Sequence, residues 1–326
     1  MNRKILCTGC CGFIGSTLIG YLLRAGYQVT GIDSLIYNNG SVIAGHLGEP
    51  GFQFHGGDAR DTSLLKALMK DADVIIPLAA IVGAPACELA PLTALEVNYY
   101  SIKNIVDNAS PHQRILYPMT NSGYGATDGK NSCVETDPLM PISTYGRTKS
   151  EGEAAVLKHR NSVVFRLATV FGASPRMRFD LLVNDFVYKL MKLKLGNEES
   201  KLFGIYEPHF LRNFVHIRDV CRAFLFAAGE ERLSGVYNIG LDEANLTKME
   251  LAHAICDSVG INRNVCQVAD GKDTDQRNYR VSSAKIMKEG FRFLHSLNQG
   301  IKEVSQLVGV LTDTEIKRMN NTGWPQ

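Results

Sequence analysis

Short apolar runs alternate with amphipathic segments through the first half of the chain. The apolar run 4–8 leads into a glycine-rich loop and then into a segment over 16–25 with the character of a helix. The next apolar run, 28–32, ends in Asp33. This alternation continues to residue 172 and predicts an α/β fold with a doubly wound parallel (Rossmann) sheet. Ligands are expected at the carboxyl ends of its strands.

The alternation of apolar and amphipathic segments ends after residue 172. A loop over 173–178 precedes a predicted helix near 181–193, and residues 213–240 again have the pattern of the main sheet. The remainder is richer in lysine and in short helical segments. We therefore expect two units, which are a Rossmann domain over 1–172 plus 213–240 and a smaller mixed α/β substrate lobe over 173–212 plus 241–326.

The composition fits two lobes and argues against several classes of partner. The 326 residues exceed one ordinary domain, and an apolar content of 45% is enough for a sizeable core. The net charge is only +2 and the basic residues are scattered, so nucleic acid is not an expected partner. The longest apolar run, 74–87, contains two prolines and is shorter than the ~20 residues that span a bilayer. Glycines also interrupt the apolar start of the chain, so we expect a mature cytoplasmic protein with no membrane partner.

Eight cysteines are spaced irregularly along the chain. They lack the two separated pairs that are typical of a structural zinc site, and no metal site is predicted. Most fall in predicted strands and helices, where cysteine acts as a small hydrophobic residue.

The glycine-rich loop has the spacing of a dinucleotide site. Gly9 allows a tight turn, Gly12 lets the backbone approach a pyrophosphate, and Gly15 lets the helix lie close to the strand. Asp33 lies 18 residues past Gly15, where a carboxylate accepts hydrogen bonds from the adenosine ribose. It would repel the 2′-phosphate of NADP, and no arginine follows at 34 or 35, so the loop predicts NAD. Asp58 is either an acceptor for the adenine amine or a solvated loop acid.

Tyr145 and Lys149 are four residues apart, which places a phenol and an ammonium on one face of a helix. With an oxidised nicotinamide nearby, the ammonium is expected to lower the phenol's pKa from about 10 toward working pH. Such a phenolate removes a proton from an alcohol. The same spacing also occurs by chance on many helices.

These motifs occur in the order typical of one enzyme family. They are the glycine loop, Asp33, Asp58, the apolar run 73–80, Asn98, Thr120, Tyr124 and the pair Tyr145 and Lys149. On them the chain resembles the extended short-chain dehydrogenase/reductase family, and within it the nucleotide-sugar epimerases and dehydratases. Later segments that match are 165–172, Asn184, 212–219, 236–240 and 277–280.

The resemblance implies that NAD is the cofactor. The residues it implies as cofactor contacts are Gly9, Gly12, Phe13, Ile14, Gly15, Asp33, Asp58, Ala59, Ala79, Asn98, Tyr145 and Lys149. Cys10 and Cys11 replace small residues of the family loop. If either thiol is exposed beside the pyrophosphate, alkylation is expected to weaken NAD binding.

The resemblance also implies the chemistry and the partners. Tyr145 is the expected base that removes the proton of a sugar 4-hydroxyl, and Thr120 is expected to hydrogen-bond the same hydroxyl. Lys149 is the residue that is expected to hold the nicotinamide ribose. The substrate is a nucleotide-diphosphate sugar, and the expected contacts to it are Thr120, Asn121, Ser122, Tyr124, Asn184, Arg212 and Arg277. Of these, Asn184, Arg212 and Arg277 are candidates for a diphosphate clamp, although each arginine could instead form a surface ion pair. In relatives, helices corresponding to 92–108 and 144–158 often form a dimer, so a homodimer is expected.

Departures from the family narrow the reaction. A 4,6-dehydratase needs two carboxyl groups, which relatives place directly after the active threonine, whereas this chain has Asn121 and Ser122. Dehydration is therefore disfavoured unless Glu135 or Asp137 reaches the site. We expect a nucleotide-sugar 4-epimerase that works by transient oxidation at carbon 4.

Two alternatives remain from the sequence. Segments over 77–85, 120–125 and 174–178 are similar to bacterial relatives that act on capsule or lipopolysaccharide sugars, some of which oxidise a GDP-linked heptose. Net 4-oxidation is therefore the close alternative. A non-catalytic NAD-sensing protein is disfavoured because Thr120, Tyr145 and Lys149 are all present.

Overall fold

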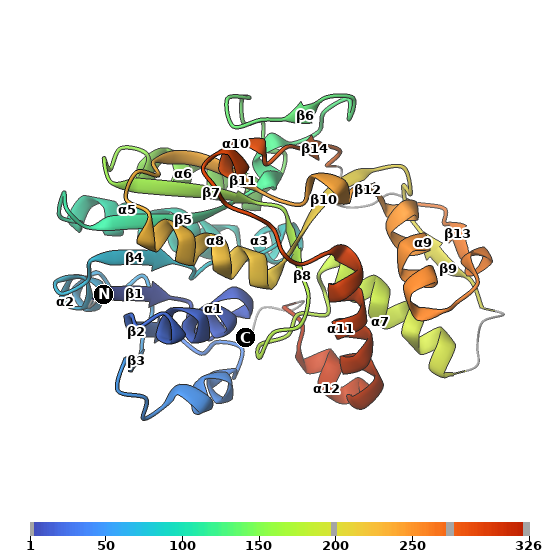
Figure 1. Cartoon of the computed structure of the whole chain (residues 1–326), viewed down its shortest axis with the longest axis horizontal. Helices are drawn as coiled ribbons and strands as arrows, with labels where there is room; N and C mark the ends of the chain where they lie inside the picture. The colour runs from blue at the N-terminus through green and yellow to red at the C-terminus, as the bar shows by residue number, and fades with distance from the viewer. Residues whose placement is uncertain (1–2, 197–200, 272–276, 322–326) are drawn as a thin grey trace.

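A parallel sheet of seven strands forms the centre of the molecule (Figure 1). The computed structural model describes residues 3–196, 201–271 and 277–321. The strands lie in the order β11-β7-β5-β4-β1-β2-β3, and every neighbouring pair is parallel. Their bounds are β1 Lys4–Thr8, β2 Gln28–Asp33, β3 Phe52–Gly56, β4 Val74–Pro77, β5 Arg114–Thr120, β7 Ser162–Leu167 and β11 Gly235–Ile239. The predicted fold class is confirmed.

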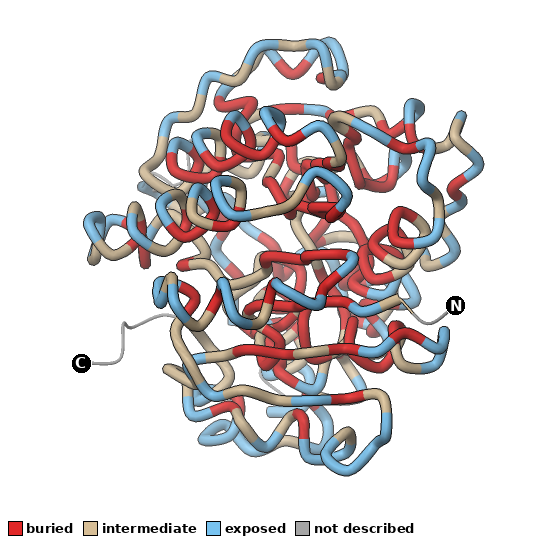
Figure 2. Tube along the Cα trace, turned by 90° about the vertical axis from the view of Figure 1, so that its left-hand side faces the viewer, coloured by how far each residue is buried: buried red, intermediate tan, exposed pale blue. Residues whose placement is uncertain are grey.

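Helices cover both faces of this sheet, so its strands are apolar on both sides. Helices α1 Phe13–Arg24 and α8 Ile217–Gly229 contact each other on one face. On the other face lie α2 Thr62–Met69, α5 Ser101–Asn108 and α6 Thr144–Val156. Two buried clusters result, one on each face, and Figure 2 shows the buried chain gathered between the layers.

The helix predicted over 92–108 is interrupted by a π turn. It consists of α4 Pro91–Leu95, the π segment η2 Glu96–Tyr100 and α5. A short helix, α3 Ala84–Leu89, precedes it. Two 3-10 segments, η1 Gly40–His46 and η3 Asn121–Tyr124, follow β2 and β5 respectively. None of the described helices is long and apolar enough to cross a bilayer.

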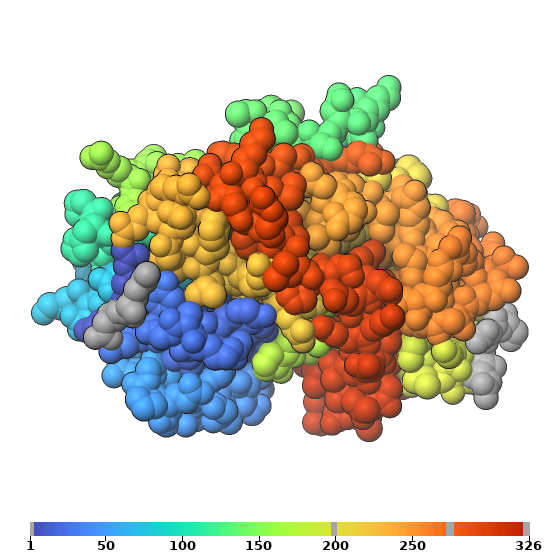
Figure 3. Space-filling model, viewed as in Figure 1, coloured from blue at the N-terminus to red at the C-terminus, as the bar shows by residue number. Residues whose placement is uncertain are grey.

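The smaller lobe is built mainly from helices. The predicted helix near 181–193 is confirmed as α7 Leu182–Leu195, and it contacts α9 Lys248–Val259 and α11 Leu297–Val310. Strands β9 Phe203–Ile205 and β13 Cys266–Val268 pair beside these helices. Two 3-10 turns, η4 Asp242–Ala244 and η5 Arg263–Val265, and the helix α12 Asp313–Arg318 complete this part. In Figure 3 the red carboxyl-terminal helices run across the face between the blue amino-terminal part and the orange α9 region.

Two short strands depart from the expected division of the chain. β10 Leu211–His216 pairs with β8 Thr169–Phe171 and with β12 Asn245–Thr247, so the return to the main sheet begins only with α8 and β11. β14 Arg280–Val281 pairs with β6 Ser132–Cys133, and the next helix, α10 Ala284–Lys288, contacts β11. Part of the carboxyl-terminal segment therefore lies against the Rossmann side. The domain boundaries stay a prediction.

Candidate functional site

A cavity of about 760 Å³ lies at the carboxyl ends of the main strands. Its wall includes most of the residues predicted from the sequence, namely Gly9, Gly12, Phe13, Ile14, Gly15, Asp33, Asp58, Ala59, Ala79, Thr120, Ser122, Tyr145, Lys149, Arg212 and Arg277. Four predicted residues, Asn98, Asn121, Tyr124 and Asn184, do not line it.

The glycine loop has the tight geometry that a dinucleotide cradle requires. Gly9 has φ +68°, and its N–H donates to the Ile32 carbonyl at 2.8 Å. A Cβ on Gly15 would lie 2.3 Å from the Gly9 carbonyl oxygen. No side chain caps α1 at Gly12, so the first N–H groups of this helix stay available for an anion. These residues fit a dinucleotide pyrophosphate.

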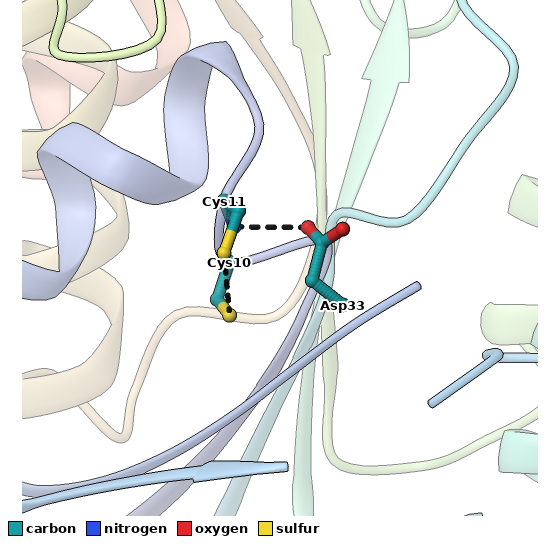
Figure 4. Close-up of side chains that lie close together, drawn as sticks. All are labelled: Cys10, Cys11 and Asp33. Carbon is teal, nitrogen blue, oxygen red and sulfur yellow. Dashed lines mark hydrogen bonds between the residues drawn. The ribbon is translucent and has the colours of Figure 1, made fainter. Parts of the chain in front are cut away.

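Asp33 is held in place by backbone N–H groups. Its two carboxylate oxygens accept from Cys11 N at 2.9 Å and from Leu35 N at 2.8 Å (Figure 4). Burial raises the pKa of this carboxyl group, while the two backbone hydrogen bonds oppose that shift. Asn39 lies beside the same turn and donates to the Cys11 carbonyl at 2.6 Å, and its own Oδ1 is buried without a partner.

The vicinal thiols of Cys10 and Cys11 are fully buried, contrary to the exposure we considered. Reagents therefore do not reach them from the cavity as it stands, and no alkylation effect is expected without opening of the loop. Both sulfurs and an Asp33 oxygen lie within 4.8 Å of one another. A metal needs the thiolate form. The hydrogen bond between the two thiols, followed by burial, raises the pKa of Cys10, so we assign no metal here.

Asp58 is engaged by Arg60 at the rim of the cavity. The Arg60 guanidinium donates to both Asp58 oxygens at 2.7–3.1 Å and also to Glu96 at 2.7 Å. The hydrogen bond from the Arg60 side chain is the main cause of a lowered Asp58 pKa. Its contact with an adenine amine stays a prediction.

The predicted catalytic residues meet where β5 ends beside α6. Thr120 closes β5, and its Oγ1 lies 2.9 Å from Ser122 Oγ. Its side chain also interacts with that of Tyr145 and favours the phenolate. Helix α6 begins after Ser143, whose side chain accepts from Gly146 N. Lys149 follows one turn after Tyr145, and its Nζ lies 4.2 Å from the centroid of the Tyr117 ring.

In the protein without cofactor, burial dominates the pKa of both Tyr145 and Lys149, and the predicted lowering of the Tyr145 pKa by Lys149 and an oxidised nicotinamide stays a prediction. Burial raises the pKa of Tyr145 to about 12. Burial also lowers the pKa of Lys149 to about 7, because a low-dielectric surrounding disfavours both charged forms. The positive charges of Arg178 and Arg277 favour the phenolate, but burial outweighs them. A positive charge brought into the cavity by an oxidised nicotinamide would lower the pKa of Tyr145, which the protein alone does not do.

We expect Lys149→Met to flatten the pH dependence of stability of the cofactor-free protein. The unfolded lysine, with a pKa near 10.5, keeps a proton that the folded one loses above about pH 7. Unfolding therefore takes up a proton in this window, and the wild-type free energy of unfolding rises with pH from about 7 toward 10. Urea unfolding at several pH values measures the slope, with the exposed Lys158→Met as control. Equal slopes in wild type and Lys149→Met would contradict the lowered pKa.

Asn98 and Asn184 support the cavity from behind. Asn98 is fully buried, accepts from Ile81 N at 2.8 Å and donates to the Ile81 carbonyl at 3.0 Å. Asn184 accepts from Gly172 N at 3.2 Å and donates to the Arg178 carbonyl at 2.9 Å. Since Ile81 and Arg178 line the cavity, both asparagines position its wall, contrary to the direct contacts we expected.

Tyr124 belongs to a buried network and not to the sugar pocket that we expected. Its hydroxyl donates to Asn238 Oδ1 at 2.7 Å and accepts from Arg166 at 3.0 Å. Arg166 in turn pairs with the buried Glu153. A tyrosine that follows the active threonine in sequence is thus turned into the core by the 3-10 turn η3.

Asn121 lies on the same turn. It is fully buried, and neither side-chain polar atom has a hydrogen-bond partner among the described residues. It is not in the cavity wall, so its predicted contact to substrate has no support from the position of its side chain.

Sequence reasoning missed two arginines in the loop after β8. Arg176 and Arg178 are both buried and line the cavity. Arg178 pairs with Asp180 at 2.5 Å. The sequence does show two basic residues in a loop that leads into the predicted substrate lobe. Nothing in their spacing, however, indicates that their side chains point into the cavity.

The chain matches known proteins over most of its length. Residues 5–240 match the NAD dependent epimerase/dehydratase family. A dTDP-glucose 4,6-dehydratase from an Actinoplanes species is 29% identical over 92% of this chain and 96% of the relative. An uncharacterised UDP-glucose epimerase from Bacillus subtilis is 32% identical over 73% of this chain and 76% of the relative.

A solved structure agrees with these relatives. The UDP-glucuronic acid 4-epimerase from Bacillus cereus, in complex with UDP-glucuronic acid and NAD, superposes with a TM-score of 0.79 at 25% identity, covering 94% of this chain and 99% of the other. The cradle at Gly9 and Gly15, Asp33 and the pair Tyr145 and Lys149 all lie in or beside the matched segment and around one cavity. The chain belongs to the NAD-dependent epimerase/dehydratase family and is an enzyme that uses NAD.

Proposed function

We propose that the protein is a nucleotide-sugar 4-epimerase that oxidises carbon 4 transiently. Tyr145 removes the proton of the 4-hydroxyl, while Thr120 hydrogen-bonds the same oxygen. Lys149 holds the nicotinamide ribose, and its ammonium balances the phenolate as it forms. NAD, when bound, accepts a hydride from carbon 4 and returns it. Epimerisation results when the keto sugar rotates in the site, so that the hydride returns to the opposite face of carbon 4.

The observation that carries this proposal is the state of the carboxylates in the cavity wall. The described residues contribute four, Asp33, Asp58, Asp180 and Asp185. Asp33 accepts from two backbone N–H groups, and the other three are paired with Arg60, Arg178 and Lys189. Beside Thr120 stands Ser122, which cannot protonate a leaving hydroxyl at neutral pH. Loss of water therefore has no acid and base of its own among these side chains.

Glu135 and Asp137, the two carboxylates that could replace the missing pair, are held elsewhere. Glu135 Oε1 accepts from Asn238 N at 2.8 Å, and Asp137 accepts from Val134 N at 2.8 Å. Neither residue lines the cavity. A swing into the site would leave the backbone N–H of Asn238 or of Val134 without its present partner. This favours epimerisation over 4,6-dehydration, although a 4,6-dehydratase is among the relatives.

Arginines in the wall suit a diphosphate-linked sugar. Arg212 and Arg277 line the cavity, and the Arg277 guanidinium donates to Ser122 Oγ. Their planar forks match phosphate or carboxylate oxygens. Together with the UDP-glucuronic acid bound by the Bacillus cereus relative, this supports a nucleotide-diphosphate sugar as substrate.

A homodimer remains part of the proposal. Leu89, Leu92 and Tyr100, on α3, α4 and η2, expose 71%, 76% and 51% of their surfaces. An apolar helical surface of this kind is what a second copy of the chain would cover.

The proposal is tested by incubating the protein with a panel of UDP-, dTDP- and GDP-linked hexoses and identifying the products by NMR and mass spectrometry. The expected product is the 4-epimer of one substrate, with no build-up of NADH absorbance. A ketone product with stoichiometric NADH would show net 4-oxidation instead. A product lighter by one water would show a dehydratase, and either result would reject the epimerase.

A further inference from the structure

The loop 173–178 lies directly on the cofactor cradle. Ser174 Oγ donates to the Phe13 carbonyl at 2.7 Å and lies 3.1 Å from the hydroxyl oxygens of Ser16 and Thr17. The backbone N–H of Arg176 donates to Ser16 Oγ at 3.2 Å. The chain that enters the smaller lobe is thus hydrogen-bonded to the first turn of α1, where a pyrophosphate binds.

The Arg176 guanidinium is buried without an ion-pair partner among the described residues. Only 6% of its surface is exposed, and it lines the cavity. Its hydrogen-bond and ring partners are neutral: Asn321 Oδ1 at 2.7 Å, the Met177 carbonyl, and the Tyr37 ring, whose centroid lies 5.3 Å from Cζ. The carboxylates of Asp180 and Asp33 favour its charge without a direct ion pair, and the guanidinium of Arg178 opposes it. Arg178, two residues further on, is paired with Asp180. A buried cation without a direct ion pair is costly unless a ligand supplies one.

We propose that Arg176 donates hydrogen bonds to the pyrophosphate of NAD and that, through it, the loop 173–178 is joined to the bound cofactor. The backbone of Arg176 is fixed to the same helical turn that offers its N–H groups to the pyrophosphate. Tyr37 and Asn321 hold the guanidinium in the wall, so its fork is oriented before the cofactor arrives. The contact joins the cofactor to the loop that contains Arg178, which lines the same cavity as Tyr145.

Two other phosphates are less well placed. A 2′-phosphate would lie beside the Asp33 carboxylate, which repels it. The substrate diphosphate has Arg212 and Arg277 in the other part of the wall. The pyrophosphate is the phosphate that belongs at the first turn of α1, to which Arg176 is bonded.

The experiment compares Arg176→Met and Arg176→Lys with the wild type in binding of NAD, NADP, ADP, adenosine and UDP by calorimetry. We expect Arg176→Met to raise the Kd for NAD by about 10- to 100-fold, which is the value of charge-assisted hydrogen bonds. ADP should weaken as well, while adenosine and UDP should bind as before. Arg176→Lys keeps the charge but loses the fork, so its Kd for NAD should lie between those of wild type and Arg176→Met. Arg218→Met, which removes a partly exposed arginine on α8, is the control and should not change NAD binding.

Each other outcome overturns the proposal. Equal weakening of adenosine and NAD would mean that Arg176 only packs against Tyr37. Weakening of UDP with unchanged NAD would assign it to the substrate, and a loss confined to NADP would assign it to a 2′-phosphate. If Arg176→Met fails to fold, wild-type NAD affinity in Arg176→Lys would still contradict the role of the fork. None of these readouts depends on which reaction the enzyme catalyses.

Discussion

Tyr145→Phe is expected to lower kcat by about 10²- to 10⁴-fold and to leave NAD binding unchanged. The phenol lines the cavity beside Thr120, where it is placed to take a proton from an alcohol. It interacts with the Thr120 side chain and lies on the same face of α6 as Lys149. Phenylalanine keeps the ring and its packing but has no oxygen to accept the proton. Steady-state kinetics on the substrate found in the panel, with calorimetric titration of NAD, measures both effects.

Tyr124→Phe is the matched control, because it removes the same atom from a tyrosine outside the cavity. Its hydroxyl bonds Asn238 and Arg166, so its loss should lower the free energy of unfolding by about 1–3 kcal/mol. Turnover should fall far less than in Tyr145→Phe. Wild-type turnover in Tyr145→Phe would remove Tyr145 as the base, and a large loss of turnover in a folded Tyr124→Phe would return Tyr124 to the substrate site.

Gly15→Ala is expected to abolish NAD binding and to destabilise the protein by about 1–3 kcal/mol. The added Cβ would lie 2.3 Å from the Gly9 carbonyl oxygen and 2.7 Å from the Cys10 Cα, and both are backbone atoms. The loop or the helix must therefore shift, and the N–H groups at the start of α1 move with it. NAD titration and urea unfolding of the purified variant measure the two losses.

Gly20→Ala tests whether the position or the residue type matters. Gly20 lies in the same helix, and its added Cβ would meet the flexible end of Arg24 at 3.1 Å and the His46 ring at 3.5 Å, with no backbone atom among these contacts. We expect normal NAD affinity and a gain in stability of up to about 1 kcal/mol, because alanine favours a helix interior. Normal NAD affinity in Gly15→Ala would contradict the close cradle that we describe.

The predictions that agree with the geometry of the structure rest on local sequence motifs. Gly9, Gly12 and Gly15 fulfil their steric roles within one turn, and Asp33 follows them at the end of the next strand. Tyr145 and Lys149 need only one helix to share a face. Spacing along the chain is enough to predict such sets, because few residues separate their members.

The predictions that failed depended on which way a side chain turns and on its surroundings. Tyr124 follows Thr120 closely in sequence, but η3 directs its hydroxyl to Asn238, which lies far away along the chain. Arg176 reaches the cofactor cradle because the loop after β8 returns to α1. Neither tertiary contact can be predicted from the spacing of residues along the chain. Burial, which raises the pKa of Tyr145 in the cofactor-free protein, is likewise a tertiary effect that spacing along the chain does not show.

The fate of the hydrogen on carbon 4 tests the proposed reaction most directly. A substrate identified in the panel is synthesised with deuterium at carbon 4, and the label is located by NMR after turnover. We predict that the deuterium is found at carbon 4 of the 4-epimer, because the hydride returns to the carbon that it left. Deuterium on NADH with a ketone product, or deuterium at carbon 6 of a product that has lost water, would contradict an epimerase.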